Sequence, residues 1–397
     1  MSMAAAGEKI RVAFLPPSSQ RLAVSPSLYL TSIAALSSIH TNTRIMVDEY
    51  TRFRFEGKVS IRPWSWEEHP DRYDVATILL VGPTGSGKSS FIEALSGDGA
   101  SMGISSDQLE GFTKTLTPYE LINAGFGNSY STRDTICLVD TPGFSDSTIS
   151  EFEIIDMVKK WMKTHQIEEI NHIMYFSSIT DKRLPGSRKT TMEMVKALIK
   201  LGRLEVLHKA NEGSLSIITT MWDTLWTDRA RSQAESHFTQ LTDDIWKDFI
   251  SDGTYIAKFH NTTSSAFQIL DQSRTHWGVA YGDAFATRND EHPLRETAYG
   301  RFLYRDLVDR ITSGKEQKQA LELELSLMGA DAEESAKGNG SGADDEQGGY
   351  DDLTRLIRER LEESERTLKR FEEQLIEFGE PPEGLKVDSD KEGVSHK

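Results

Sequence analysis

A glycine-rich segment with one lysine is the part of this sequence best suited to bind phosphate. It has the pattern G-x-x-x-x-G-K-S and comes directly after an apolar run that predicts a buried strand. Glycines let the chain turn tightly, so that successive backbone N–H groups can point at a phosphate chain. We expect the lysine to reach the β- and γ-phosphates and the serine after it to ligate Mg²⁺. The predicted phosphate site comprises Gly82, Gly85, Ser86, Gly87, Lys88, Ser89 and Ser90.

The residues around this segment favour a nucleotide site over a chance arrangement. Apolar spacing from Ser89 to Leu95 predicts a helix, whose N-terminus would add its positive dipole end to the site. The alternative is a Gly/Ser-rich loop that contains a lysine by chance. The strand pattern before it and the helix pattern after it argue against that alternative.

A second strand pattern, over 135–139, leads to a carboxylate and a glycine. Asp140 at the strand end is expected to hold the water shell of Mg²⁺, and Gly143 allows its N–H to approach a γ-phosphate. Alone, D-T-P-G is a common turn. Of two threonines in the preceding loop, we favour Thr113 over Thr115 as the second Mg²⁺ ligand and γ-phosphate sensor. The predicted metal ligands are Ser89, Thr113 and Asp140, and the groups expected to act on the γ-phosphate are Lys88, Thr113 and Gly143.

A third strand pattern, Leu215 to Thr219, leads to T-M-W-D, which indicates guanine recognition. The carboxylate of Asp223 can accept hydrogen bonds from both N1–H and the N2 amine of guanine, a donor pair that adenine lacks. Thr220 opens this box, and Met221 stands where the usual box has lysine; a methionine can pack on the base. The structural alternative places Trp222 in the core and makes Asp223 a helix N-cap.

A last strand pattern, Tyr255 to His260, is followed by a cluster of Ser and Thr residues. Within it, Ser265 and Ala266 are similar to the S-A element whose backbone N–H contacts guanine O6. Alone, such a cluster is merely a loop, so its place after the other motifs carries the prediction.

In this order the motifs resemble those of TRAFAC-class P-loop GTPases, most closely the septin-like branch. That branch includes immunity-associated (IMAP) GTPases, chloroplast import-receptor GTPases, septins and a group of fungal G-domain proteins, the last being the most similar. The resemblance implies an α/β G-domain fold with a mainly parallel sheet flanked by helices. It also implies Mg²⁺ with bound GTP or GDP, and hydrolysis to GDP and phosphate. It rests on stretches at 82–92, 109–113, 140–144, 179–183 and 219–223.

One departure concerns hydrolysis. Small signalling GTPases have a glutamine after D-x-x-G that orients the attacking water, whereas this chain has Phe144. The resemblance therefore implies slow hydrolysis, or hydrolysis stimulated when two copies pair across the nucleotide face. Asp181 and Arg183 could reach a partner's nucleotide in such a homodimer, or could belong to a solvated loop.

Composition predicts five segments along the chain. The amphipathic helix could pair with its copy as a short coiled coil or fold back onto the G domain. The expected segments are an N-terminal extension, partly disordered (1–74), the G domain (75–312), a short helix and flexible acidic linker (313–350), the amphipathic or coiled-coil helix (351–380) and a disordered tail (381–397).

The charge of the 397-residue chain excludes some partners. Its formal net charge is −17, and residues 315–397 hold 23 acids and 12 bases. Such an acidic chain is a poor nucleic-acid binder, and it has no run of 18 apolar residues that would predict a transmembrane anchor. The single cysteine, Cys137, allows no internal disulfide, which favours a reducing, cytoplasmic location. Residues 1–45 have the composition of an organellar targeting segment, a disordered extension, or sequence upstream of a start at Met46.

Three functions are compatible with these patterns. The first is a GTP-dependent switch or assembly protein that acts on a protein partner the sequence does not identify. The second is an ATP-using, kinase-like P-loop enzyme, which Asp223 and the lack of an Arg-rich lid disfavour. The third is a nucleotide-binding scaffold without turnover.

Overall fold

The computed structural model describes residues 52–69, 75–96, 103–104, 113–127, 134–181, 186–201, 215–274, 294–337 and 344–385. All of them belong to one compact unit, Thr51–Lys397. The expectations for residues 1–45, for Arg183 and for the end of the acidic tail, 386–397, therefore lie outside the described part of the chain.

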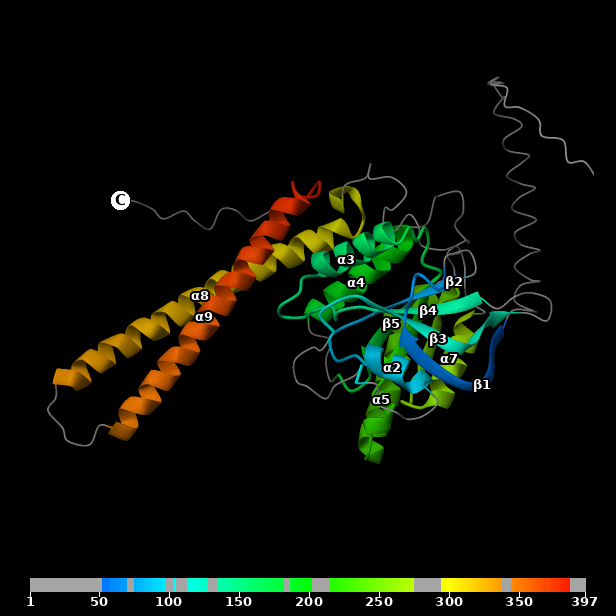
Figure 1. Cartoon of the computed structure of the whole chain (residues 1–397), viewed down its shortest axis with the longest axis horizontal. Helices are drawn as coiled ribbons and strands as arrows, with labels where there is room; N and C mark the ends of the chain where they lie inside the picture. Colours follow the sequence, from blue (N-terminus) through cyan, green and yellow to red (C-terminus); the bar gives the residue numbers. More distant parts are fainter. Residues whose placement is uncertain are drawn as a thin grey trace, which may run out of the picture. The chain divides into compact units, whose positions relative to one another are not determined.

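The centre of the unit is a mostly parallel sheet of seven strands in the order β1-β3-β4-β2-β5-β6-β7 (Figure 1). Strands β2, β4, β5, β6 and β7 run parallel, and β3 joins β4 to the antiparallel edge strand β1. This confirms the predicted α/β fold class. The strands are β1 (Arg52–Pro63), β2 (Val75–Val81), β3 (Thr117–Gly127), β4 (Asp134–Asp140), β5 (His172–Ser178), β6 (Leu215–Thr220) and β7 (Tyr255–Lys258).

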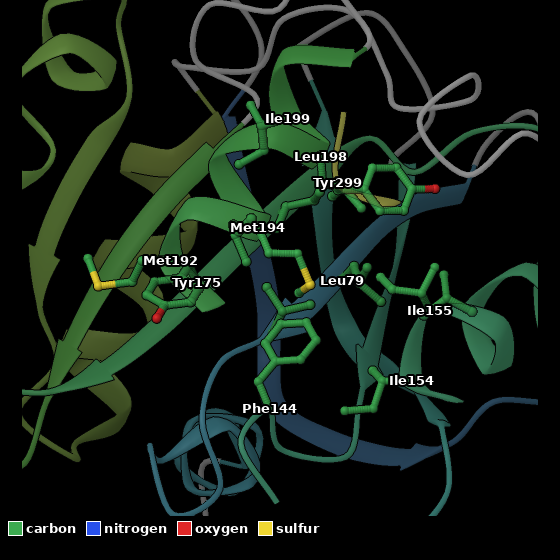
Figure 2. Close-up of a cluster of buried hydrophobic side chains, with 14 of the residues drawn as sticks. Leu79, Phe144, Ile154, Ile155, Tyr175, Met192, Met194, Leu198, Ile199 and Tyr299 are labelled. Atoms are coloured by element: carbon green, nitrogen blue, oxygen red, sulfur yellow. The ribbon is translucent and has the colours of Figure 1, made fainter. Parts of the chain in front are cut away.

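Alternate residues of the central strands point into two separate hydrophobic cores, one on each face of the sheet. Along β2, Leu79 and Val81 face one core, whereas Ile78 and Leu80 face the other. The first core contains helices α3 (Glu151–Thr164), α4 (Gly186–Leu201), α5 (Asp228–Gln240) and α6 (Lys247–Ser251) with the start of α8 (Gly300–Lys337), and the second contains α2 (Lys88–Leu95) and α7 (Thr263–Arg274). Figure 2 shows part of the first core. Burial on both faces explains why these strands are continuous apolar runs in the sequence.

The antiparallel edge of the sheet differs from the prediction. The expected N-terminal extension, 1–74, contains β1 (Arg52–Pro63), which pairs with β3 (Thr117–Gly127). The first half of β1 is largely exposed and a register shift interrupts its pairing between Phe55 and Ser60, so no clean alternation marks the strand in the sequence.

The C-terminal segments also differ from the prediction. The expected short helix and linker over 313–350 is corrected by α8, which is continuous for 38 residues from Gly300 to Lys337, and by α9, which begins at Asp344. Contacts with α9 (Asp344–Phe378) stabilise α8, because the side chain of Leu368 lies against Gly314. Such packing supports a helix that local propensity alone does not predict past residue 312.

Helix α9 folds back along α8 in the antiparallel direction. Its ion pair between Glu365 and Lys318 lies farther along α8 than the ring contact of Phe378 with Tyr304. Phe378 also contacts Phe152 of α3, so α9 reaches the helix layer of the sheet. Of the two arrangements that the sequence allows, the structure has the folded-back one. In the described part of the chain, every helix is too short or too polar to cross a bilayer.

Candidate functional site

The glycine-rich segment forms a tight loop between β2 and α2. Gly82, Gly85 and Gly87 all have positive φ angles, 149°, 73° and 88°. A Cβ atom at Gly82 would lie 2.4 Å from the carbonyl oxygen of Phe176 in β5, so this position has no space for a side chain. The loop therefore has the tight glycine turns that the motif predicts.

Lys88 begins α2 and lies beneath the loop. Its side chain is buried, with Nζ donating to the carbonyl oxygens of Gly82 at 3.1 Å and Pro83 at 3.2 Å. Burial lowers the pKa of Lys88 to about 8, and the nearby carboxylates of Asp140 and Asp146 raise it in part. A bound phosphate would add negative charge beside this ammonium and favour its charged form.

The three predicted metal ligands lie together. Asp140 Oδ2 accepts from Ser89 Oγ at 2.7 Å and from Thr113 Oγ1 at 3.3 Å, and these two hydroxyls are 3.3 Å apart. Thr115 is exposed and forms no part of this cluster, so the geometry favours Thr113.

The carboxyl group of Asp140 is suited to hold a cation. It is 1% exposed, and its Oδ1 is buried with no hydrogen-bond partner among the described residues. Burial raises the pKa of Asp140, and Lys88, Ser89 and Thr113 lower it in part. A hard cation with oxygen ligands would satisfy the unpartnered oxygen and restore the charge, so these residues fit Mg²⁺.

The loop after β4 is packed directly on the phosphate loop. Thr84 N–H donates to Phe144 O at 3.1 Å, and Phe144 N–H donates to Gly82 O at 3.0 Å. A Cβ atom at Gly143 would lie 2.2 Å from Thr84 Oγ1. The backbone of Gly143 is therefore beside the loop, as expected for a γ-phosphate contact.

The Phe144 ring points into the core and away from the phosphate loop. It is 2% exposed and lies with Leu79 and Ile154 in Figure 2.

Two further serines of the predicted phosphate site lie near Lys88. Ser86 is 2% exposed, and its Oγ has no hydrogen-bond partner among the described residues. Ser90 lies in the first turn of α2. The Ser86 hydroxyl is therefore a buried donor of the loop without a partner in the described part of the chain.

The T-M-W-D box follows β6 and connects to the phosphate loop. Thr220 is buried, and its Oγ1 donates to Ser86 O at 2.8 Å, so this residue holds the two loops together. Asp223 lies in a short 3₁₀ turn, η2 (Trp222–Thr224), and its Oδ2 accepts from Asn261 Nδ2 at 3.3 Å. The N-cap of α5 is Thr227, so Asp223 does not have the capping role of the structural alternative.

Trp222 does have a packing role. Its ring contacts Phe238, Lys258 Nζ lies 4.4 Å from its centre, and its Nε1 donates to Thr219 Oγ1 at 3.0 Å. The indole is thus held in place and leaves Asp223 at the loop surface.

The structure corrects the role expected for Ser265 and Ala266. Both lie in the first turn of α7 and are buried. Their backbone N–H groups donate to Thr262, from Ser265 to Oγ1 at 3.2 Å and from Ala266 to the carbonyl oxygen at 3.0 Å, so neither is free for guanine O6. The residue beside Asp223 is instead Asn261. Its only signal in the sequence was its position soon after a predicted strand end.

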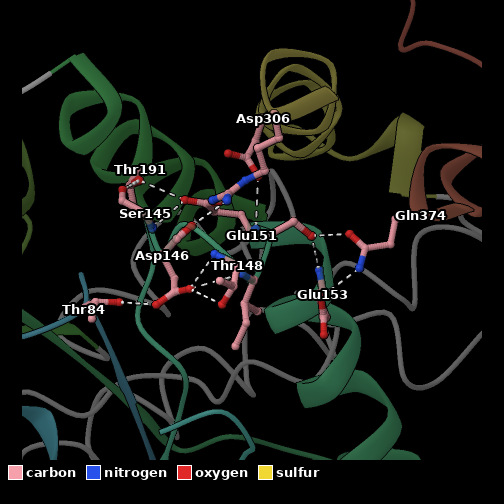
Figure 3. A network of polar contacts seen from close by, with 12 residues as sticks. Thr84, Ser145, Asp146, Thr148, Glu151, Glu153, Thr191, Asp306 and Gln374 are labelled. Atoms are coloured by element: carbon pink, nitrogen blue, oxygen red, sulfur yellow. Dashed lines mark hydrogen bonds and ion pairs between the residues drawn. The ribbon is translucent and has the colours of Figure 1, made fainter. Parts of the chain in front are cut away.

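A buried polar network ties the loop after Gly143 to the C-terminal helices (Figure 3). Glu151 Oε1 accepts from Ser145 N at 2.9 Å, and its Oε2 pairs with Arg310 Nη2 of α8 at 2.8 Å. Arg310 Nε also binds Asp306 Oδ2 at 2.8 Å. Burial and the neighbouring Glu151 raise the pKa of Asp306 to about 8. Sequence reasoning missed this network, because its partners are up to 224 residues apart.

Helix α9 joins the same network. Gln374 accepts from Ser150 Oγ at 2.6 Å and donates to Glu153 Oε2 at 2.8 Å, and Arg370 donates to the carbonyl oxygen of Thr148. A cavity of about 940 Å³ opens beside this network, between the loop and helices α4, α8 and α9. The loop that meets the phosphate loop is therefore also held by both C-terminal helices.

Comparison with known proteins agrees with the fold and the motifs. Residues 77–209, about a third of the chain, match the family described as 50S ribosome-binding GTPase, so this part of the chain is a P-loop GTPase G domain. A search of curated proteins found no match.

Two solved structures are similar to parts of this chain. A dimerization-deficient mutant of Toc33 from Arabidopsis thaliana has 13% identity and a TM-score of 0.37, over 56% of this chain and 89% of Toc33. LeoA, a bacterial dynamin GTPase from ETEC, has 17% identity and a TM-score of 0.34, over 77% of this chain. The match spans 59% of LeoA.

Proposed function

We propose that this chain binds GTP and GDP with Mg²⁺ and acts as a GTP-dependent switch or assembly GTPase. The observation that carries the proposal is the meeting of Ser89, Thr113 and Asp140 beside buried Lys88, with one carboxylate oxygen that has no hydrogen-bond partner among the described residues. Lys88 would bind the β- and γ-phosphates, and the three oxygen ligands would hold Mg²⁺ with its water. When bound, the ion would neutralise charge that develops on the phosphates.

The base site favours guanine over adenine. A carboxylate at Asp223 can accept from N1–H and N2–H of guanine, and the Asn261 amide holds one of its oxygens at 3.3 Å. Adenine has no matching donor pair, so it would leave the carboxylate unpaired. This supports a guanine nucleotide rather than an ATP-using enzyme.

Hydrolysis is slow in a single copy, or is stimulated by a second copy across the nucleotide face. The ring of Phe144 is buried, so it cannot orient water. Asp181 lies just after β5 and could face a partner's nucleotide. The order of the motifs supports membership of the septin-like branch of these GTPases, with a protein partner still to be identified.

The test is a competition titration of the purified full chain. Bound fluorescent GTP is displaced by GTP, GDP and ATP, and the mass of the protein is measured with GTPγS and with GDP. We expect GTP and GDP to compete at least a hundredfold better than ATP. Equal competition by ATP would contradict the guanine site, and no binding of any of the three would contradict the proposal as a whole.

A further inference from the structure

We propose that Asp146, together with Thr84, orients the water that attacks the γ-phosphate, the task for which Phe144 has no suitable group. The inference rests on the proposed GTP binding and adds the residues that act on its γ-phosphate. Figure 3 shows the side chain of Thr84 reaching Asp146 from the phosphate loop.

Thr84 lies where the two phosphate-binding loops touch. It is the third residue of the phosphate loop, and its Oγ1 would be 2.2 Å from a Cβ atom at Gly143. Its backbone N–H donates to the carbonyl oxygen of Phe144. Gly143 is expected to contact the γ-phosphate, so the Thr84 hydroxyl is at the γ-phosphate end of the site.

Asp146 faces this hydroxyl. Its Oδ2 accepts from Thr84 Oγ1 at 3.2 Å, and its Oδ1 accepts from the backbone N–H groups of Thr148 at 2.8 Å and Ile149 at 3.2 Å. Each oxygen thus has a separate role: Oδ1 holds the turn and Oδ2 faces the phosphate loop. Its negative charge raises the pKa of Lys88 in part.

The carboxylate is both charged and held in place. Partial burial raises its pKa, but hydrogen bonds from Thr148 and Thr84 outweigh burial, and the pKa of Asp146 is lowered. Arg310 of α8 donates to the carbonyl oxygen of Asp146 and also pairs with Glu151. The loop therefore presents an ionised acceptor in a fixed position.

The chemistry follows from this arrangement. A water donates one hydrogen bond to Asp146 Oδ2, and its oxygen attacks the γ-phosphorus. The new O–P bond forms as the bond to the β–γ bridging oxygen breaks, and that electron pair leaves on GDP. The proton of the water passes to a γ-phosphate oxygen, because a carboxylate of lowered pKa is a weak base. Phosphoryl transfer depends mainly on such positioning.

The charge of Asp146 makes this role separable from phosphate binding. A carboxylate repels the γ-phosphate and is favoured only with water between them. Removing the charge should therefore leave GTP binding unchanged or tighter while it slows hydrolysis. A residue that only supports the fold would weaken both together.

The test compares Asp146→Asn with Ser147→Ala, an exposed neighbour in the same loop. Asparagine keeps an oxygen that can accept from Thr148 and Ile149 but replaces the acceptor that faces Thr84. Thr84→Val removes the hydroxyl with little change of shape. Single-turnover hydrolysis, affinity for GTPγS and affinity for GDP with aluminium fluoride are measured in the full chain.

For Asp146→Asn we expect hydrolysis to fall at least tenfold, GTPγS affinity to stay equal or rise, and affinity for GDP with aluminium fluoride to fall with the rate. Thr84→Val should show a weaker form of the same pattern, and Ser147→Ala none of it. Unchanged hydrolysis in Asp146→Asn, or parallel loss of GTPγS binding and hydrolysis, would overturn the inference. If unmutated protein does not bind GTPγS, the proposed function fails instead.

Discussion

The carboxyl group of Asp306 should make stability depend on pH in an unusual direction. Its pKa is raised to about 8 by burial and by Glu151, against an ordinary value of 3.8. Between these values the folded chain holds a proton that the unfolded chain releases, so stability falls as pH rises. The slope is at most 2.303RT per pH unit, so the loss from pH 5.5 to 7.5 is on the order of 2–3 kcal/mol.

The variant Asp306→Asn isolates this effect. Asparagine resembles the protonated acid, because its amide can donate toward Glu151 while its oxygen accepts from Arg310. Lys88, with a pKa of about 8, is present in both proteins, so its contribution cancels in the comparison. The assay is the urea midpoint of each protein at pH 5.5, 6.5 and 7.5.

We expect the unmutated chain to lose stability relative to Asp306→Asn across this range. Most of the difference should appear by pH 7.5. Parallel midpoints at all three pH values would refute the view that Asp306 keeps its proton in the folded chain.

Three further predictions test the site and its support. Lys88→Ala should weaken GTP binding by ~2–3 kcal/mol, the scale of a hydrogen bond to a charged group, while exposed Lys247→Ala should not; equal affinities in titration calorimetry would contradict the phosphate site. Asp223→Asn should lose GTP preference and gain affinity for xanthine nucleotides, which have a carbonyl in place of the guanine amine; unchanged preference in competition would rule out the base contact. Arg310→Ala should destabilise the fold by about 3–5 kcal/mol, because Glu151 stays buried without its partner, and exposed Arg301→Ala should not; matching urea midpoints would disprove it.

The phosphate-loop motif and Asp140 could be recognised in the sequence because the loop follows β2 and Asp140 ends β4, two strands that are buried on both faces. Gly82 directly follows β2 and Asp140 ends β4, and these strands are adjacent and parallel, so the phosphate loop and the Asp140 side chain lie at the same edge of the sheet. The fold class followed from the same apolar runs. Such sequence patterns are local, so they can be recognised without knowledge of the rest of the chain.

The remaining features depend on contacts between distant residues. Asn261 meets Asp223 only because two loops converge, and Arg310 reaches Glu151 across 159 residues. Strand β1 is half exposed, so it lacks the apolar run of a buried strand. The continuation of α8 past residue 312 depends on its packing against α9. The local helix propensity of the sequence carries no information about that packing.

The most direct test of the central claim is the affinity for GTP measured with Mg²⁺ and again with EDTA. If Ser89, Thr113 and Asp140 hold the ion against the phosphates, chelation should weaken GTP binding at least tenfold, about 1.4 kcal/mol. The variant Asp140→Asn should bind GTP with the same affinity in both conditions. A GTP affinity of the unmutated chain that does not change with chelation would contradict the account.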